Sequence, residues 1–120
     1  IISITRFIPS KNKLQYHKGN ASKDEWTWLE KINGKEIWGT DGEIPKFEYK
    51  RITVGIGNTI INLPVENIYE PSLYFTTVNI DRSSNTLYIS ALNSDGAGGY
   101  VVLWIVEKGK FTKRILSIPF

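Results

Sequence analysis

The chain has no cysteine and no methionine, and its 120 residues include a single histidine, His17. The absence of cysteine excludes disulfide bonds, thiolate catalysis and Cys-ligated zinc. A histidine-based metal site would need carboxylates to complete it, and a Ser-His-Asp relay would have His17 as its only base. Because the polar stretch 11–21 (KNKLQYHKGNA) predicts a loop, we expect His17 to be an exposed loop residue. We expect neither a metal nor another cofactor.

Long apolar runs are also missing. The longest, residues 100–106, is far shorter than the roughly 20 residues needed to span a bilayer, so we expect no membrane span. The first ten residues (IISITRFIPS) lack the basic start and the long apolar region of a signal peptide. Since position 1 is not methionine, we expect a processed chain or a part of a longer product.

A strong excess of one charge is missing too, because 15 basic residues against 12 acidic ones give a formal charge of +3. A dedicated nucleic-acid binder usually shows a basic stripe, whereas acids interleave with bases along most of this chain. The first acid is Asp24, and the basic residues before it are Arg6, Lys11, Lys13, Lys18 and Lys23. We interpret this stretch as a solvated face, and we expect no nucleic-acid partner.

The last third of the chain predicts an antiparallel meander of three strands. Residues 100–106 (YVVLWIV) are seven apolar residues in a row, and such a continuous run is typical of a strand that is covered on both faces. Residues 86–92 and 111–118 are the expected neighbours. Turn-forming residues at 93–99 (NSDGAGG) and 107–110 (EKGK) connect the three.

Shorter strands are expected upstream. Asn33-Gly34 is the strongest hairpin signal, because a type I′ turn needs positive φ at both central residues. Expected strands are residues 1–8, 29–32, 35–38, 47–56, 59–63 and 73–80. Residues 22–25 fit a capping box, which predicts a helical turn through 26–29, with a strand over 26–32 as the alternative. One further helical turn is expected within 64–71.

These elements predict a mainly β protein, an antiparallel sandwich or open barrel of about eight strands with at most one or two short helices. Residues 1–120 show no repeat or linker, so we expect a single domain.

Acidic residues beside glycines are the first candidate site. Asp41 and Glu43 flank Gly42, and Asp95 precedes Gly96. Paired carboxylates can act as general acid and base, but Asp-Gly is also a common turn dipeptide, and we favour the turn. The glycines of 96–99 are followed by an expected strand rather than a helix, so a phosphate-binding loop is disfavoured. We interpret this loop as free to contact a partner.

Tryptophans are the second candidate site. Trp26, Trp28 and Trp38 lie in the first third of the chain, and Trp26 and Trp28 share one face if that stretch is extended. Exposed aromatics can stack on a sugar or a base, or anchor a protein interface. Core packing, which in a small β domain takes up most aromatic residues, is the interpretation that we favour over an exposed anchor. The partner-binding residues that we select are Trp26, Trp28, Trp38, Asp41, Glu43 and Asp95.

Two stretches resemble a loose group of small bacterial β-rich proteins. Residues 38–45 (WGTDGEIP) match a WGTDG-x-x-P pattern, and residues 94–104 match SDGAG-x-Y-x-x-x-W. The group includes exported proteins and proteins discussed as immunity proteins of interbacterial toxins. The resemblance implies no catalytic residues, and bacterial cytoplasm and periplasm are both compatible with it.

We therefore expect a non-enzymatic inhibitor whose partner is a protein, a cognate toxin domain such as a nuclease, with its active site covered. A small-ligand or carbohydrate-binding β domain is the alternative.

Overall fold

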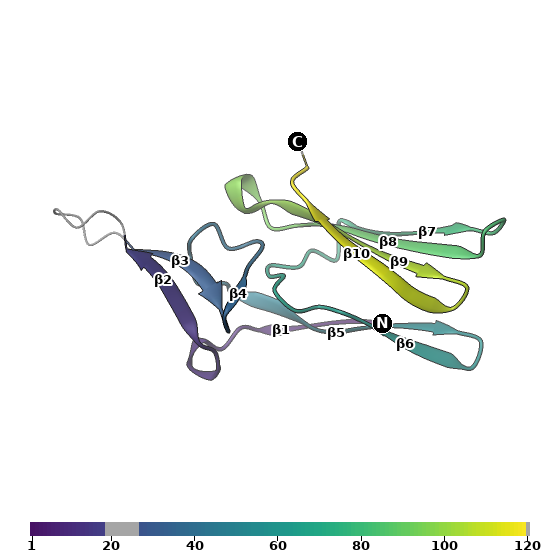
Figure 1. Cartoon of the computed structure of the whole chain (residues 1–120), viewed down its shortest axis with the longest axis horizontal. Coiled ribbons are helices and arrows are strands. Elements are labelled where there is room, and N and C mark those ends of the chain that lie inside the picture. Colours follow the sequence, from purple (N-terminus) through teal and green to yellow (C-terminus); the bar gives the residue numbers. More distant parts are fainter. Residues whose placement is uncertain (19–26, 120) are drawn as a thin grey trace.

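The computed structural model describes residues 1–18 and 27–119. These residues form three antiparallel sheets (Figure 1). The largest has the order β10-β9-β8-β7 and consists of β7 (Thr76–Asp81), β8 (Thr86–Asn93), β9 (Tyr100–Glu107) and β10 (Lys110–Ser117). The second has the order β1-β5-β6 and consists of β1 (Ile2–Arg6), β5 (Phe47–Ile56) and β6 (Thr59–Leu63). The third has the order β2-β3-β4 and consists of β2 (Leu14–Lys18), β3 (Thr27–Ile32) and β4 (Lys35–Glu36).

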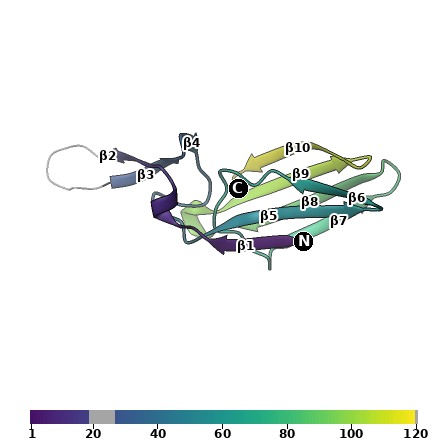
Figure 2. The same ribbon diagram turned by 90° about the horizontal axis from the view of Figure 1, so that it is seen from below.

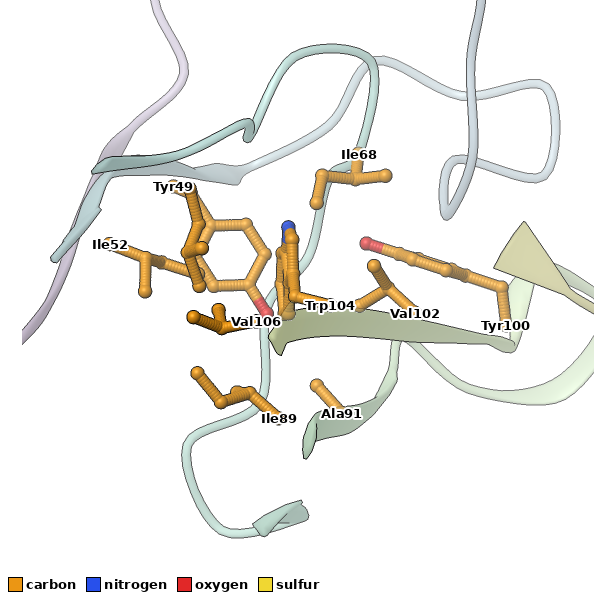
Figure 3. Close-up of a cluster of buried hydrophobic side chains, with 10 residues drawn as sticks. Tyr49, Ile52, Ile68, Ile89, Ala91, Tyr100, Val102, Trp104 and Val106 are labelled. Carbon is orange, nitrogen blue, oxygen red and sulfur yellow. The ribbon is translucent and has the colours of Figure 1, made fainter. Parts of the chain in front are cut away.

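The first two sheets pack face to face as a sandwich (Figures 1 and 2). Strand β9 is central because alternate residues, from Tyr100 to Val106, point into the core. Trp104 is fully buried there and meets the ring of Tyr49 edge to face, with ring centroids 5.8 Å apart (Figure 3). Its indole Nε1 donates to the carbonyl of Pro64 at 2.8 Å, which satisfies the one polar atom that this large side chain buries. The predicted β sandwich and the C-terminal meander are confirmed.

The prediction that β9 is covered on both faces is wrong for the described chain. Val101, Leu103 and Ile105 alternate with the core residues and are only half-buried. The reason is architectural, because among the described residues the four-stranded sheet has a partner sheet on one side only (Figure 1).

The third sheet extends from one end of the sandwich (Figure 1). It has a small core of its own, in which Phe7, Leu29, Ile32 and Tyr69 are buried. The predicted hairpin at Asn33-Gly34 is confirmed, with φ of 55° and 80° at the two residues. The predicted loop at 11–21 is partly wrong, because residues 14–18 form β2. Half-buried Leu14 packs against the small core, and the backbone pairs with β3.

Several local expectations also need correction. Residues 27–32 are a strand, so the alternative to the helical turn is right, whereas residues 22–25 lie outside the described residues. Segment 64–71 contains no helical turn in the structure. It instead forms isolated bridges to Trp38 and Glu48. Strand β7 begins at Thr76 rather than at residue 73. The two helical pieces are short 3₁₀ turns, Pro9–Lys11 and Gly96–Gly98.

One buried amide, that of Asn93, joins the end of β8 to three other segments. Its Nδ2 donates to the hydroxyl oxygens of Tyr49 at 2.7 Å and Tyr100 at 3.2 Å. Its Oδ1 accepts from the backbone N–H of Ser72 at 2.8 Å, and the Tyr100 hydroxyl donates onward to the carbonyl of Tyr69 at 2.7 Å. Because Asn93 is fully buried, no water can replace these bonds.

Replacement of Asn93 by leucine tests this network. The Asn93→Leu variant should lose about 2–4 kcal/mol of unfolding free energy, because the Ser72 N–H and the Tyr49 hydroxyl lose their buried partner. Urea unfolding followed by circular dichroism measures the loss. The control Asn62→Leu changes an exposed residue of β6 and should stay within about 0.5 kcal/mol of the parent. Equal losses in the two variants would contradict the role of the network.

Buried tyrosines predict a loss of stability at alkaline pH. Burial raises the pKa of Tyr69 to about 12, with a smaller contribution from the carboxylate of Glu48. Burial also raises the pKa of Tyr49 and of Tyr100. Because these values exceed the roughly 10 of unfolded tyrosine, the unfolded state releases its protons first. The stabilisation is therefore complete below about pH 10 and is lost as pH rises toward 12.

The measurement is the free energy of unfolding from about pH 9 to 12. Tyr69→Phe should flatten the decline, since phenylalanine has no proton to lose. Tyr74→Phe, at an exposed tyrosine, should leave the decline unchanged. A stability that is flat across this range would refute the assignment.

Candidate protein-binding surface

Two loops far apart in the sequence lie against each other at the end of the sandwich from which the third sheet extends. They are residues 39–43 and residues 94–98. The hydroxyl of Ser94 donates to the carbonyl of Gly39 at 2.8 Å. A Cβ placed on Gly98 would lie 3.1 Å from that same carbonyl oxygen and 3.4 Å from the Cβ of Asp41. The 39–43 loop belongs to the WGTDG-x-x-P stretch, and the 94–98 loop belongs to the SDGAG-x-Y-x-x-x-W stretch. These two stretches are thus in contact.

The backbone of both loops is shaped by left-handed residues. Asp41 and Gly42 have φ of 46° and 81°, and Glu43 N–H closes the turn on the carbonyl of Thr40 at 2.9 Å. Aspartate and glycine both tolerate this conformation, so the predicted turn at Asp41-Gly42 is confirmed. Asp41 and Glu43 are exposed, and Asp95 is exposed on the neighbouring loop. The turn therefore points its acids outward.

Trp28 covers the 39–43 loop from the side of β3. A Cβ on Gly42 would fall inside the Trp28 ring, so the indole lies directly on the glycine backbone. The N–H of Leu29 donates to the carbonyl of Gly42 at 2.9 Å, which fixes the loop to β3. Trp28 is 38% exposed, and it thus offers a large apolar surface beside Asp41 and Glu43.

Trp38 differs from Trp28, because it packs between the 39–43 loop and the main core. Its ring packs on that of Tyr100 with centroids 6.0 Å apart, and it borders the main core. Its backbone pairs with segment 67–69, through bonds of 3.0 Å to Asn67 and Tyr69. Half-buried Trp38 also forms one wall of a shallow groove that is lined by Glu30, Glu36 and Ile37.

Of the six residues selected from the sequence, four therefore lie on one surface, namely Trp28, Asp41, Glu43 and Asp95. Trp38 is mainly a packing residue beneath them, and Trp26 lies outside the described residues. Sequence reasoning missed Glu30 and Glu36. The Asn33-Gly34 hairpin was the available signal, because it folds β4 back onto β3 and pairs Glu36 with Lys31, next to Glu30.

The sequence also did not show where His17 would lie. It is exposed, as expected, but it lies on β2 and is the cross-strand partner of Trp28. Within residues 1–18 and 27–119, no group of three or more His, Cys, Asp or Glu residues is placed to hold a metal ion. We define the acidic surface as Trp28, Glu30, Glu36, Asp41, Glu43 and Asp95. It combines five exposed carboxylates with one broad aromatic ring, and half-buried Lys31, the cross-strand partner of Glu36, lies among them. Because the carboxylates outnumber this one cation, the arrangement favours a cationic partner.

Comparison of the chain with protein-family models, with curated proteins and with solved structures finds no match. Among the described residues, no helix has the length and apolar character to cross a membrane.

The contact between Trp28 and Gly42 can be tested by adding one methyl group. Gly42→Ala should destabilise the protein by about 2–3 kcal/mol, because the Cβ displaces the indole and the backbone is left-handed. It should also shift tryptophan fluorescence as Trp28 moves. Gly57→Ala is the matched control, since Gly57 has φ of 59° with open space around it, and its cost is about 1 kcal/mol. Equal costs and unchanged fluorescence would contradict the contact.

Proposed function

We propose that this protein is a non-enzymatic inhibitor that binds another protein, and more specifically an immunity protein that neutralises a bacterial toxin by covering its active site. The observation that supports the proposal is the convergence of the 39–43 and 94–98 loops. It places Asp41 and Glu43, which flank Gly42 under the exposed ring of Trp28, on a loop that contacts the loop of Asp95.

The chemistry of the acidic surface favours a cationic partner. A nuclease binds the phosphates of its substrate with lysine and arginine, and several carboxylates on a fixed surface can occupy such a cleft in place of phosphates. Complementary charges accelerate association and select the partner. The aromatic ring of Trp28 supplies the kind of anchor that dominates binding energy. We therefore take a toxin with a basic active site, such as a nuclease, as the partner.

A second candidate function rests on the groove beside Trp38. Carboxylates next to a tryptophan wall can bind a small ligand or a sugar, and Glu30 and Glu36 line this groove with Ile37. This function predicts saturable changes of tryptophan fluorescence on addition of oligosaccharides. A protein inhibitor does not require such changes.

The proposed function is tested by capture of the partner followed by an activity assay. The chain is used as bait in a lysate of the source organism, and the retained proteins are identified by mass spectrometry. We expect one stoichiometric partner whose nuclease or other toxic activity falls when the bait is added. A bait that retains nothing under gentle washing, or a retained protein whose activity is unaffected, would refute the inhibitor in this form.

Binding of the captured partner should depend on the acidic surface. Asp95→Ala and Asp41→Asn should each weaken the affinity by about tenfold or more, because each removes a carboxylate from the proposed contact, and asparagine keeps the left-handed turn at position 41. Glu107→Ala is the matched control, since Glu107 is exposed at the opposite end of β9, and its effect should stay within about threefold. Calorimetry measures the three affinities. Changes within threefold for all three variants would exclude these anchors.

A further inference from the structure

Within the described residues, one face of the four-stranded sheet has no other sheet packed on it, and this face is apolar at one end. Strand pairing sorts its outward side chains into rows. The first row is Ser117, Val101, Leu92 and Phe75, and the second is Ile115, Leu103, Ser90 and Thr77. The third row is Lys113, Ile105, Tyr88 and Asn79. The fourth is Lys110, Glu107 and Asp81, with Thr86 between them buried and hydrogen-bonded to Ser84. The rows therefore run from apolar to charged.

We define the outer apolar face as Phe75, Tyr88, Leu92, Val101, Leu103, Ile105 and Ile115. Phe75 is 54% exposed, and it joins the sheet through the N–H of Leu92, which donates to its carbonyl at 3.2 Å. Tyr74, which is 87% exposed, extends the face by meeting the Phe75 ring edge-on at 4.8 Å. A continuous apolar patch of this kind on a soluble chain marks an interaction site.

The area of the face is close to what one half of a stable interface requires. Phe75, Tyr88, Leu92 and Ile115 are 36–54% exposed, and the other three residues are half-buried. With about 150–250 Å² for an aromatic side chain, the face exposes roughly 350–500 Å², and the ring of Tyr74 adds roughly 130–220 Å². A standard interface buries about 800 Å² per partner, and the polar residues of the same rows supply the remainder. A single side chain or small ligand would leave most of the face in water.

The order of the rows indicates which occupant fits. A twofold axis parallel to the strands lays this sheet on a second copy with every row opposite the same row. Leu92 then faces Val101 of the second copy, and Ile105 faces its Tyr88. A twofold axis across the strands would place the apolar first row on the charged fourth row, which costs desolvation without pairing.

Charge complementarity agrees with the same axis. It places β10 of one copy over β7 of the other, so that Lys110 faces Asp81 and Lys113 faces Asn79. Both contacts occur twice in the dimer because the interface is isologous. One arrangement therefore places the apolar first row on itself and the lysines of β10 opposite Asp81 and Asn79.

We propose that the protein is a homodimer in which the outer apolar faces of two copies pack together, with the twofold axis parallel to the strands. This arrangement covers β9 on its second side, in agreement with its continuous apolar sequence. It goes beyond the proposed inhibitor function, because the dimer interface and the acidic surface use different residues.

Sedimentation equilibrium over a concentration series measures the dimer. Leu92→Lys should raise the dissociation constant at least about tenfold, since it places a cation in the apolar first row of both copies. Ile115→Lys, in the second row, should act in the same direction. Ile60→Lys is the matched control, because Ile60 is 72% exposed on the outward face of β6, and it should leave the constant unchanged.

The direction of the twofold axis is tested by a substitution in the charged fourth row. Lys110→Glu should weaken the dimer about threefold or more, because it faces Asp81 of the second copy. Lys108→Glu, in the hairpin turn outside the face, should have no effect. Circular dichroism confirms that each variant is folded.

A chain that stays monomeric up to about 1 mM, where binding is worth only about 4 kcal/mol, would overturn the proposal. So would a dimer that is insensitive to Leu92→Lys. A monomer that instead binds the captured toxin more weakly after Leu92→Lys would assign the face to that partner. Loss of dimerisation with intact toxin inhibition would separate the two proposals.

Discussion

The buried amide of Asn93 is the interaction on which the rest of the structure depends. Its three hydrogen bonds connect β8 with Tyr49 of β5, with Tyr100 of β9 and with the segment at Ser72. The Tyr100 hydroxyl carries the chain of bonds to the carbonyl of Tyr69, whose N–H bonds to Trp38. Hydrophobic contacts hold the two sheets together, but they do not specify direction. A fully satisfied polar network inside the core fixes which segments meet.

The hydrogen-bond network of Asn93 also positions the two loops of the acidic surface. Ser94 follows Asn93, so the hydroxyl that reaches Gly39 starts from a fixed point. Trp38 lies on Tyr100 and holds the other loop in place from below. Asp41, Glu43 and Asp95 therefore stand on a base held by hydrogen bonds and ring packing, although they lie in loops. A preorganised surface loses little conformational entropy when it binds, which suits an inhibitor.

Local signals in the sequence were enough to predict most strands. The Asn33-Gly34 turn acts over a few residues, and the strands that it joins are present in the structure. Strand β2 was not predicted, because its one core contact is that of Leu14 and the residues around it are largely polar. The meeting of the 39–43 and 94–98 loops could not be predicted, since it depends on long-range packing around Tyr100. The apolar run of β9 indicated two covered faces, but sequence alone does not tell whether a face is covered by the same chain or by another.

The separate core of the third sheet has a consequence for the energetics of recognition. Phe7, Leu29, Ile32 and Tyr69 form a cluster much smaller than the main core, and regions with few buried contacts open more readily than the whole molecule unfolds. Trp28 and Glu30 lie on β3, which contributes Leu29 and Ile32 to the smaller cluster, whereas Asp95 lies in the loop between β8 and β9 of the sandwich. The acidic surface thus draws on residues beside both clusters. A partner that bound residues on both would, by linkage, stabilise the smaller cluster against local opening.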